Sequence, residues 1–336
     1  MTNKKLNFGI IGIGWWSDVL AERAKKSNLF EITACFSRDQ AKCEKFVNQF
    51  GGRSTNSLEE LVSIPSIDGV IITTPNSSHL EVVKIAARAK KHIFLEKPIA
   101  NEISESREIE KVCREAGIVL SVGHSYRRHK GIRQIFSLIK DDSLGRISLA
   151  EGIFSKDHGL RLTSDKDWRF LSKEVPAGCL MQIGIHHIDN LIYLLGDIEE
   201  VSSMFARLET KAEINDVGSV LLRFKSGAIG FVCADYISVD RFELTVSGTK
   251  GIARFDLKTG LSVLMKGENT WRLVSDANSD YLLEELDEFA RCVTNSSSPE
   301  VGAHEAIKAL SVIHAAIKSN KEKRVVSMSE ITSFTQ

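Results

Sequence analysis

The segment Phe8-Gly9-Ile10-Ile11-Gly12-Ile13-Gly14-Trp15-Trp16-Ser17 decides how the first half of the chain is interpreted. In it an apolar run ends in two closely spaced glycines, and an amphipathic segment follows. Glycines 12 and 14 allow the backbone to turn sharply out of a strand and to approach a pyrophosphate, which the first amides of the next helix then bind. Ser17 stands where the fingerprint usually has its third glycine. The segment predicts a dinucleotide site that includes Gly12, Gly14, Trp15 and Trp16, and the alternative is an ordinary strand-to-helix turn.

The composition is that of a globular protein of 336 residues, which is long enough for two domains. Lys plus Arg and Asp plus Glu number 44 each, so charge gives no argument for nucleic acid or an anionic membrane as partner. The six cysteines are scattered without a Cys-x-x-Cys pair, which favours reduced thiols and no metal site. No apolar run is long enough to cross a bilayer, and the apolar start lacks a signal-peptide cleavage site. We therefore expect a cytoplasmic protein.

Strand-like runs alternate with helical patterns in the first half of the chain. This alternation predicts parallel strands joined by crossover helices, which is a doubly wound α/β sheet of the Rossmann type. Ligands of such sheets bind at the carboxyl ends of the strands. The predicted strands are 8–13, 31–36, 69–73, 92–95 and 119–122, and the clearest helical patterns are 80–90 and 103–116.

Ser37 and Arg38 occupy the position, about twenty residues after the glycines, where an acidic residue would bind the ribose hydroxyls of NAD. Ser37 can donate a hydrogen bond, and Arg38 can pair with a 2′-phosphate or stack on adenine. NADP is therefore favoured over NAD, although the neighbouring Asp39 keeps both cofactors open.

Two further polar turns follow predicted strands in this half. Thr74, Pro75 and Asn76 form the first, and His79 stands at the next helix start, where a capping role is the alternative to cofactor contact. The second is Leu95-Glu96-Lys97-Pro98, in which a buried strand places a lysine and the proline restricts the residue before it. We expect the side chains of both turns to reach the cofactor.

The second half of the chain, from residue 147, shows strands at short intervals separated by hairpin signals such as Lys225-Ser226-Gly227. It predicts an α+β domain with an open, mainly antiparallel sheet and helices on one side. We place the dinucleotide-binding domain at 1–123 and a second domain at 124–336, whose role in substrate binding and oligomerisation is given below as what a family resemblance implies. The predicted strands are 147–154, 201–208, 217–224, 228–235, 241–247 and 252–256.

The segment from Ala177 to Gly196 carries the polar residues of this half on a largely apolar helical pattern. Helical spacing puts Gln182, His186, Asp189 and Asn190 on one face, which should line a cavity. His187 points away by about a hundred degrees and is interpreted as structural. Adjacent histidines diverge on a helix, so a metal site is not expected here.

These motifs together resemble the glucose-fructose oxidoreductase, inositol dehydrogenase and MocA (Gfo/Idh/MocA) family. The resemblance is carried by the Gly-x-Gly turn, Thr-Pro-Asn, Glu96-Lys97-Pro98, Asp167-Trp168-Arg169 and a segment similar to Gly-Gly-x-x-x-Asp-x-Gly-x-His-x-x-Asp. It implies that Lys97 lies beside the nicotinamide and the reacting carbon, and that His186 is the acid–base residue. It also implies that Asp189 reaches the substrate and that Arg169 contacts cofactor or substrate. Tyr126 and Arg127 can reach the substrate pocket as well, and the alternative for these two residues is packing and a surface ion pair. The chain departs from the pattern at Gln182, where the family often has aspartate.

The function that the resemblance implies is hydride transfer between NAD(P) and a carbinol carbon of a sugar, polyol or related carbohydrate. His186 would accept the hydroxyl proton, and Lys97 would stabilise the developing negative charge on the same oxygen. The family's second domain commonly packs its open sheet face against another subunit, which implies a homodimer or homotetramer. Two alternatives stay open: a nucleotide-sugar dehydrogenase of the same family, and a catalytically weak regulatory protein that binds nucleotide and sugar, which Gln182 motivates.

Overall fold

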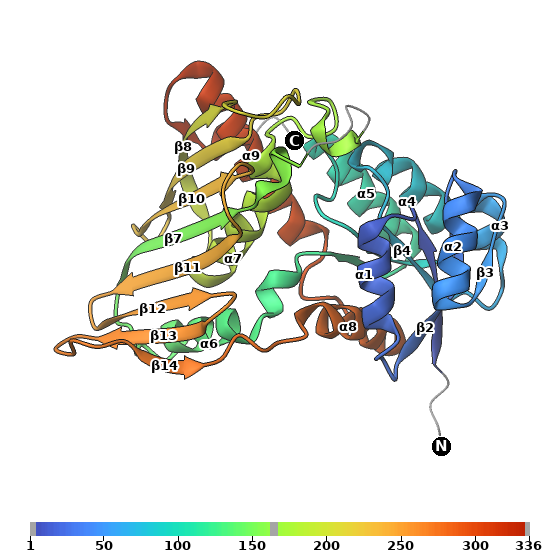
Figure 1. Cartoon of the computed structure of the whole chain (residues 1–336), viewed down its shortest axis with the longest axis horizontal. Coiled ribbons are helices and arrows are strands. Elements are labelled where there is room, and N and C mark those ends of the chain that lie inside the picture. Colours follow the sequence, from blue (N-terminus) through green and yellow to red (C-terminus); the bar gives the residue numbers. More distant parts are fainter. Residues whose placement is uncertain (1–4, 162–166, 333–336) are drawn as a thin grey trace. The chain divides into compact units, whose positions relative to one another are not determined.

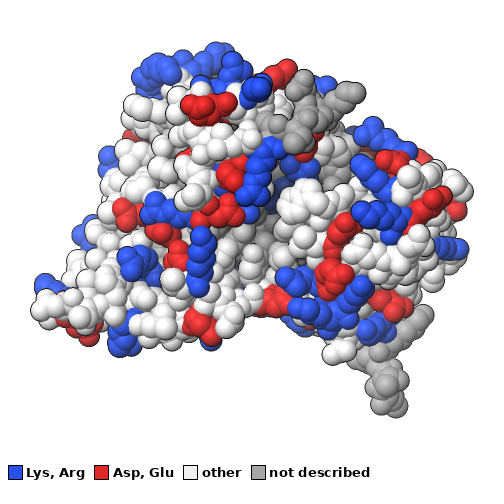
Figure 2. Space-filling model, viewed as in Figure 1, with Lys and Arg blue, Asp and Glu red and all other residues white. Residues whose placement is uncertain are grey.

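The computed structural model describes residues 5–161 and 167–332, and the chain divides into two compact units (Figure 1). The first unit comprises Met1–Ser125 and Asp280–Ile307, and the second comprises Tyr126–Ser279 and Lys308–Gln336. The predicted division into 1–123 and 124–336 places 280–307 with the second domain, whereas the structure places it with the first. Acidic and basic side chains are intermixed on the face seen in Figure 2, in keeping with a net charge of zero.

The first unit is built on a six-stranded sheet in the order β3-β2-β1-β4-β5-β6, in which all pairs are parallel. The predicted doubly wound α/β fold is confirmed. The strands are β1 (Leu6–Ile11), β2 (Phe30–Phe36), β3 (Arg53–Ser54), β4 (Gly69–Ile72), β5 (His92–Leu95) and β6 (Leu120–Val122). The helices are α1 (Trp15–Ala24), α2 (Gln40–Phe50), α3 (Leu58–Ser63), α4 (His79–Arg88), α5 (Ile103–Ala116) and α8 (Tyr281–Asn295).

Helix α8 explains why the late segment belongs to the first unit. The Phe289 ring centroid lies 5.0 Å from that of Phe8 on β1 and 5.9 Å from that of Phe94 on β5. Phe8, Phe30, Phe94 and Phe289 are all fully buried in one hydrophobic cluster. Burying such rings is among the largest single stabilising contributions a side chain makes, so α8 covers one face of this sheet although it is distant in sequence.

The second unit contains a nine-stranded sheet in the order β14-β13-β12-β11-β7-β10-β9-β8-β15. Neighbouring strands are antiparallel except for the parallel pair β7 and β10. The strands are β7 (Ile147–Ser155), β8 (Ile198–Ala206), β9 (Val217–Phe224), β10 (Ile229–Asp235), β11 (Arg241–Gly248), β12 (Gly251–Asp256), β13 (Gly260–Met265), β14 (Arg272–Ser275) and β15 (Val326–Ser327). The other helices are α6 (Lys130–Lys140), α7 (Ile185–Leu195), α9 (Ala303–Glu322) and α10 (Ser329–Thr332).

Among the described residues, the helices of this unit cover one face of its sheet. Helix α7 packs on β7 and β10, and α6 packs on β12 (Figure 1). Along β9 and β10 every second residue is buried, and the residues between them are partly or fully exposed. Met204 and Leu221 on the other face are 80% and 53% exposed. Among the helices in the described ranges, none has the length and apolar character that crossing a membrane requires.

Candidate functional site

The glycine turn after β1 has the geometry expected of a phosphate-binding loop. Gly12 has a φ of +92°, and a Cβ on it would lie 2.8 Å from the Thr74 amide nitrogen, so both conformation and space require glycine. Gly14 is the N-cap of α1. The Ser17 hydroxyl accepts a hydrogen bond from the Gly14 amide at 2.8 Å and donates one to the Gly14 carbonyl at 2.6 Å. The Ser17 side chain therefore stabilises the turn through two hydrogen bonds to the Gly14 backbone.

The turn after β4 lies directly against the glycine turn. The Thr73 hydroxyl donates to the Gly12 carbonyl at 2.5 Å, and the Thr74 methyl group lies where a side chain at position 12 would stand. Asn76 is buried and donates to the Asn101 side chain at 3.2 Å. The carboxyl ends of β1 and β4 thus meet at one edge of the sheet, where ligands of doubly wound folds bind.

His79 holds two turns of this edge together. Its ring is fully buried, with Nε2 3.1 Å from the Thr74 carbonyl and Nδ1 3.1 Å from the Pro98 carbonyl. This differs from the direct cofactor contact predicted for His79. Because a ring without exposed surface cannot touch a nucleotide, His79 acts on the site by positioning the two turns.

Glu96 and Lys97 extend the same edge at the end of β5. Glu96 is 8% exposed, and its carboxylate accepts hydrogen bonds from Trp16 Nε1 at 2.5 Å and from the Lys97 amide at 3.2 Å. The Lys97–Pro98 peptide is cis, and the Lys97 side chain is partly exposed. Glu96 therefore ties helix α1 to the turn that presents Lys97.

The turn after β2 presents Arg38. Its side chain is exposed, whereas the Asp39 carboxylate caps α2 by accepting from the Lys42 amide at 3.4 Å and lies 4.0 Å from Lys42 Nζ. The Ser37 hydroxyl accepts from the Asp39 amide at 3.3 Å. The carboxylate that follows Arg38 in the sequence, that of Asp39, is thus engaged in capping α2.

In the second unit, the polar segment is not one continuous α-helix. Leu180–Gly184 is a π-helix, and α7 begins at Ile185. The predicted α-helical spacing of Gln182 and His186 is therefore wrong, because the wider π turn changes the direction of the side chains before it. Such turns are frequent at functional sites.

His186 stands on the first turn of α7 among aromatic rings. Its ring centroid lies 4.8 Å from that of Tyr126 in an edge-to-face arrangement and 6.1 Å from that of Phe154. The Tyr126 ring is stacked on Phe242 at 4.3 Å. His186 itself is 8% exposed. The structure thus brings Tyr126 and His186 together. Phe154 and Phe242 were not predicted as neighbours of His186, because in the sequence they look like any other core phenylalanine of a strand.

Arg127 and Asp189 form a buried ion pair in the second unit. Arg127 Nε donates to Asp189 Oδ2 at 3.0 Å and Nη2 donates to Oδ1 at 2.5 Å, and their side chains are 5% and 2% exposed. The Arg127 guanidinium also lies 5.0 Å from the Tyr193 ring centroid. This geometry differs from the substrate contacts predicted for both residues, because each charge is already directed at the other and little surface is left.

His187 has the structural role expected from its direction on the helix. It is fully buried, its Nε2 lies 3.1 Å from the Ile153 carbonyl, and its ring is stacked on Phe242 at 4.2 Å. Burial lowers the pKa of His187 to about 3, so the imidazole is neutral. Gly152 provides the space for it, since a Cβ there would lie 2.7 Å from the His187 side chain.

Gln182 and Arg169 belong to one hydrogen-bonded arrangement in this unit. Gln182 Oε1 accepts from the Tyr236 hydroxyl at 2.6 Å, and Gln182 Nε2 donates to the Arg169 carbonyl. The Arg169 guanidinium lies 4.4 Å from the Trp168 ring and 3.6 Å from Asp167 Oδ1. Tyr236 was not predicted as a site residue. The feature of the sequence that could have indicated it is its position directly after strand β10. The predicted cofactor contact of Arg169 stays a prediction.

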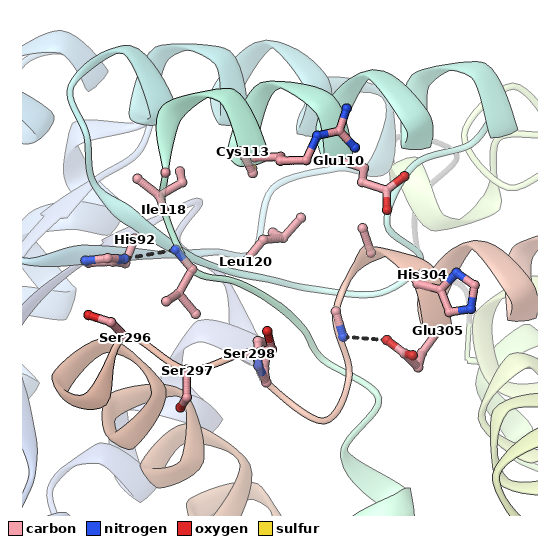
Figure 3. Close-up of a pocket in the computed structure, with 16 residues that line it drawn as sticks. His92, Glu110, Cys113, Ile118, Leu120, Ser296, Ser297, Ser298, His304 and Glu305 are labelled. Carbon is pink, nitrogen blue, oxygen red and sulfur yellow. Dashed lines mark hydrogen bonds between the residues drawn. The ribbon is translucent and has the colours of Figure 1, made fainter.

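A separate hollow of about 500 Å³ lies in the first unit at the amino ends of β5 and β6 (Figure 3). His92 Nδ1 accepts from the Val119 amide at 3.0 Å on one side of it, and Glu305 accepts from the Gly302 amide at 3.0 Å on another. No predicted site residue lines this hollow. This hollow is at the opposite end of the strands from Gly12, Thr74 and Lys97. It is therefore separate from the turns at the carboxyl ends of the strands, which we call the nucleotide edge.

Comparison with known proteins gives a consistent result over both units. Residues 6–124 match the model of an oxidoreductase family with an NAD-binding Rossmann fold, and residues 132–254 match the GFO/IDH/MocA C-terminal domain. Myo-inositol 2-dehydrogenase of Thermotoga maritima is 27% identical over 97% of this chain and 99% of its own length. The NADP-dependent D-xylose 1-dehydrogenase of Haloarcula marismortui is 24% identical over 97% of this chain and 94% of its own.

Solved structures extend the likeness to the whole fold. A candidate NADPH-dependent oxidoreductase from Desulfitobacterium hafniense superposes with a TM-score of 0.92 and 31% identity over 98% of this chain and 99% of that one. Aldose-aldose oxidoreductase from Caulobacter crescentus, solved with glycerol, superposes with a TM-score of 0.88 and 25% identity over 96% of this chain and 100% of that one.

Proposed function

Because the chain belongs to the Gfo/Idh/MocA family of oxidoreductases, we propose that it transfers a hydride between NAD(P) and a carbinol carbon of a sugar, polyol or related carbohydrate. The observation that carries this proposal is that each unit presents one half of the required chemistry. Lys97 follows β5 at the nucleotide edge of the first unit, and His186 stands on α7 among the aromatic rings of the second. The relatives that act on inositol and xylose support a polyhydroxylated substrate.

The nucleotide edge fits a dinucleotide. Gly12 lets the turns after β1 and β4 approach closely, since a Cβ there would meet Thr74, and the N-terminus of α1 offers the positive end of a helix dipole to a pyrophosphate. Thr74, Pro75 and Asn76 border the same edge, with Trp15 and Trp16 on α1. The nicotinamide, when bound, supplies the hydride acceptor or donor.

His186 and Lys97 divide the handling of the substrate hydroxyl. In the oxidative direction a neutral His186 accepts the hydroxyl proton as the C–H bond breaks, and in the reductive direction it returns that proton. Lys97 donates a hydrogen bond to the same oxygen and stabilises its developing negative charge. The aromatic rings of Tyr126 and Phe154 exclude water on the His186 side, which strengthens both interactions.

One assay tests this proposal. Sugars, polyols and inositols are screened with NAD and NADP by following the absorbance of the reduced nicotinamide, for the native protein, Lys97→Met, His186→Ala and the surface control Lys84→Met. We expect turnover by the native protein and the control and at least a hundredfold loss in both site variants, with nucleotide affinity retained in His186→Ala. Nucleotide binding without turnover on any substrate would instead support the regulatory alternative.

We further propose that the cofactor is NADP rather than NAD, because Arg38 is exposed on the turn after β2 and the Asp39 carboxylate is engaged in capping α2. Arg38→Ala should weaken NADP binding by about tenfold or more, since charge-assisted hydrogen bonds contribute roughly 1.5–3 kcal/mol, and should leave NAD binding within about twofold. Lys42→Ala is the matched control. Equal effects of Arg38→Ala on the two nucleotides would reject the phosphate role.

We also propose that the enzyme assembles into a homodimer or homotetramer, which the open face of the nine-stranded sheet supports. Leu221 and Met204 are exposed there, and Phe231 lies opposite Leu221 in the β-ladder. Exposed apolar residues grouped on one face are typical of subunit interfaces. Light scattering should give a mass that is a multiple of 37.3 kDa, and Leu221→Lys should reduce it. A native monomer at micromolar concentration would contradict this.

A further inference from the structure

Gln182 replaces an ionisable residue of the family motif with an amide, and both ends of that amide are used. Its Oε1 accepts a hydrogen bond from the Tyr236 hydroxyl at 2.6 Å, and its Nε2 donates to the backbone carbonyl of Arg169. A carboxylate at this position could accept from tyrosine but could not donate to a carbonyl. The local partners therefore fit an amide and not an ionised carboxylate.

Tyr236 is fixed independently of Gln182. Its ring is 2% exposed, its amide donates to the Asp216 carbonyl at 2.7 Å, and its carbonyl accepts from the Gly159 amide at 2.8 Å. The backbone of Tyr236 is thus held on both sides of the residue. Burial also raises the pKa of the Tyr236 phenol well above its ordinary value, so the hydroxyl remains protonated and donates.

The other partner, Arg169, lies in a single 3-10 turn, Trp168–Phe170. The Asp167 carboxylate caps this turn by accepting from the Arg169 amide at 3.1 Å, and the Arg169 guanidinium lies over the Trp168 ring. So short a turn has little intrinsic stability. The bond from Gln182 fixes it to the helical segment that continues into α7 and His186.

We propose that Gln182 and Tyr236 are a pair of positioning residues for the reaction: they hold the Trp168–Phe170 turn, and with it the Arg169 side chain, on the segment that carries His186. This inference rests on the proposed function for its kinetic consequence. It assigns no proton transfer to Gln182, so His186 carries the acid–base step without an ionisable partner at position 182. The Arg169 guanidinium is the group whose placement the pair controls.

The variant Gln182→Glu should show a loss of kcat/KM that depends on pH, which tests this proposal. At high pH the introduced carboxylate faces the Arg169 carbonyl without a proton to share, and the turn is released. At low pH the protonated acid can again accept from Tyr236 and donate to Arg169. We expect the ratio of native to variant kcat/KM to be about tenfold near pH 8.5, because one such hydrogen bond corresponds to roughly that factor, and to decrease as the pH is lowered toward the ordinary glutamate pKa of about 4.3.

Three comparisons complete the experiment. Gln182→Ala, Tyr236→Phe and the double variant should lower kcat/KM to a similar extent, with the double no worse than the more severe single variant. Gln134→Glu is the matched control, because Gln134 also accepts from a hydroxyl, that of Ser275 at 2.5 Å, in the same unit. It should stay within about twofold of native at every pH. A ratio for Gln182→Glu that does not vary with pH, or a silent Tyr236→Phe, would overturn the pair.

A second readout does not depend on turnover. Trypsin cleavage after Arg169 and Lys173, timed by mass spectrometry on the full chain, should be several-fold faster in Gln182→Ala and Tyr236→Phe than in native protein and Gln134→Glu. If no substrate is turned over by native protein, the proposed function fails while this comparison still decides whether the turn is held. Equal cleavage rates in all four proteins would refute the inference.

Discussion

The Arg127–Asp189 pair allows a quantitative choice between a substrate-binding role and a structural role. We consider Asp189→Asn, which is nearly isosteric and removes one charge. The native guanidinium makes two charge-assisted hydrogen bonds, at 3.0 and 2.5 Å, with side chains only 5% and 2% exposed. The variant leaves a buried cation facing a neutral amide that keeps one acceptor.

The expected loss of stability is about 3 kcal/mol, the lower end of the range for breaking a buried pair by removing one partner. For a unit of this size it corresponds to a decrease in Tm of about 6–12 °C, measured by calorimetry. Glu200→Gln is the control, because the Arg223–Glu200 pair on β9 and β8 is 51% and 42% exposed. An exposed pair contributes at most about 1 kcal/mol, so the control should change Tm by no more than a few degrees.

The double variant Arg127→Met/Asp189→Leu distinguishes two causes of destabilisation: loss of the ion pair itself, and burial of an Arg127 charge that has lost its carboxylate partner. Replacing both members with apolar side chains is often neutral, so the double variant should regain most of the Tm that Asp189→Asn loses. The reasoning is refuted if Asp189→Asn is as stable as the native protein and raises the KM of the substrate tenfold. That result would restore the substrate contact that the sequence predicts.

Three further outcomes follow from the geometry. Ser17→Ala should lower stability by about 1 kcal/mol in thermal unfolding, because both bonds to Gly14 are lost, and Ser17→Gly by about 1 kcal/mol more; equal stability would contradict the closed turn. His187 binds a proton below about pH 6.5 when unfolded but only near pH 3 when folded, so stability should fall by about 2 kcal/mol from pH 7 to 5, and less in His187→Phe; parallel pH curves would refute this. Burial raises the pKa of Cys35 and Cys113 to about 12, so at pH 8 a thiol reagent should label neither of them in native protein and both in denaturant; rapid labelling of either in native protein would contradict this.

The first sheet could be predicted from sequence because its signals are local. Strands β1, β4, β5 and β6 are short apolar runs that are mainly buried, and each ends in a turn at the carboxyl end of the sheet. Gly12 is required by its close contact with Thr73 and Thr74, which follow β4, the strand that pairs with β1. The two-residue strand β3 was not predicted, because it is too short to show a period.

The membership of α8 could not be predicted, because an amphipathic pattern shows that a helix buries one face but not what it buries that face against. Segment 281–295 follows eight of the nine strands of the second sheet in sequence, and the contacts of Phe289 with Phe8 and Phe94 reveal that it covers the first. Strand β14 was missed for a related reason, since Arg272, Leu273 and Val274 at a sheet edge are exposed and show no alternation.

The candidate site shows where arguments from spacing fail. A polar stripe on a helix identifies side chains that need partners, but those partners come from distant segments: Arg127 for Asp189, and Tyr236 and Arg169 for Gln182. Spacing also assumes 3.6 residues per turn, and the π turn at Leu180–Gly184 violates that assumption between the two residues whose alignment mattered most. An aspartate four residues before the histidine implies an ionisable dyad only if both side chains point into the same space. Here the widened turn directs Gln182 to a tyrosine hydroxyl and a backbone carbonyl, so the surrounding structure fits an amide at this position.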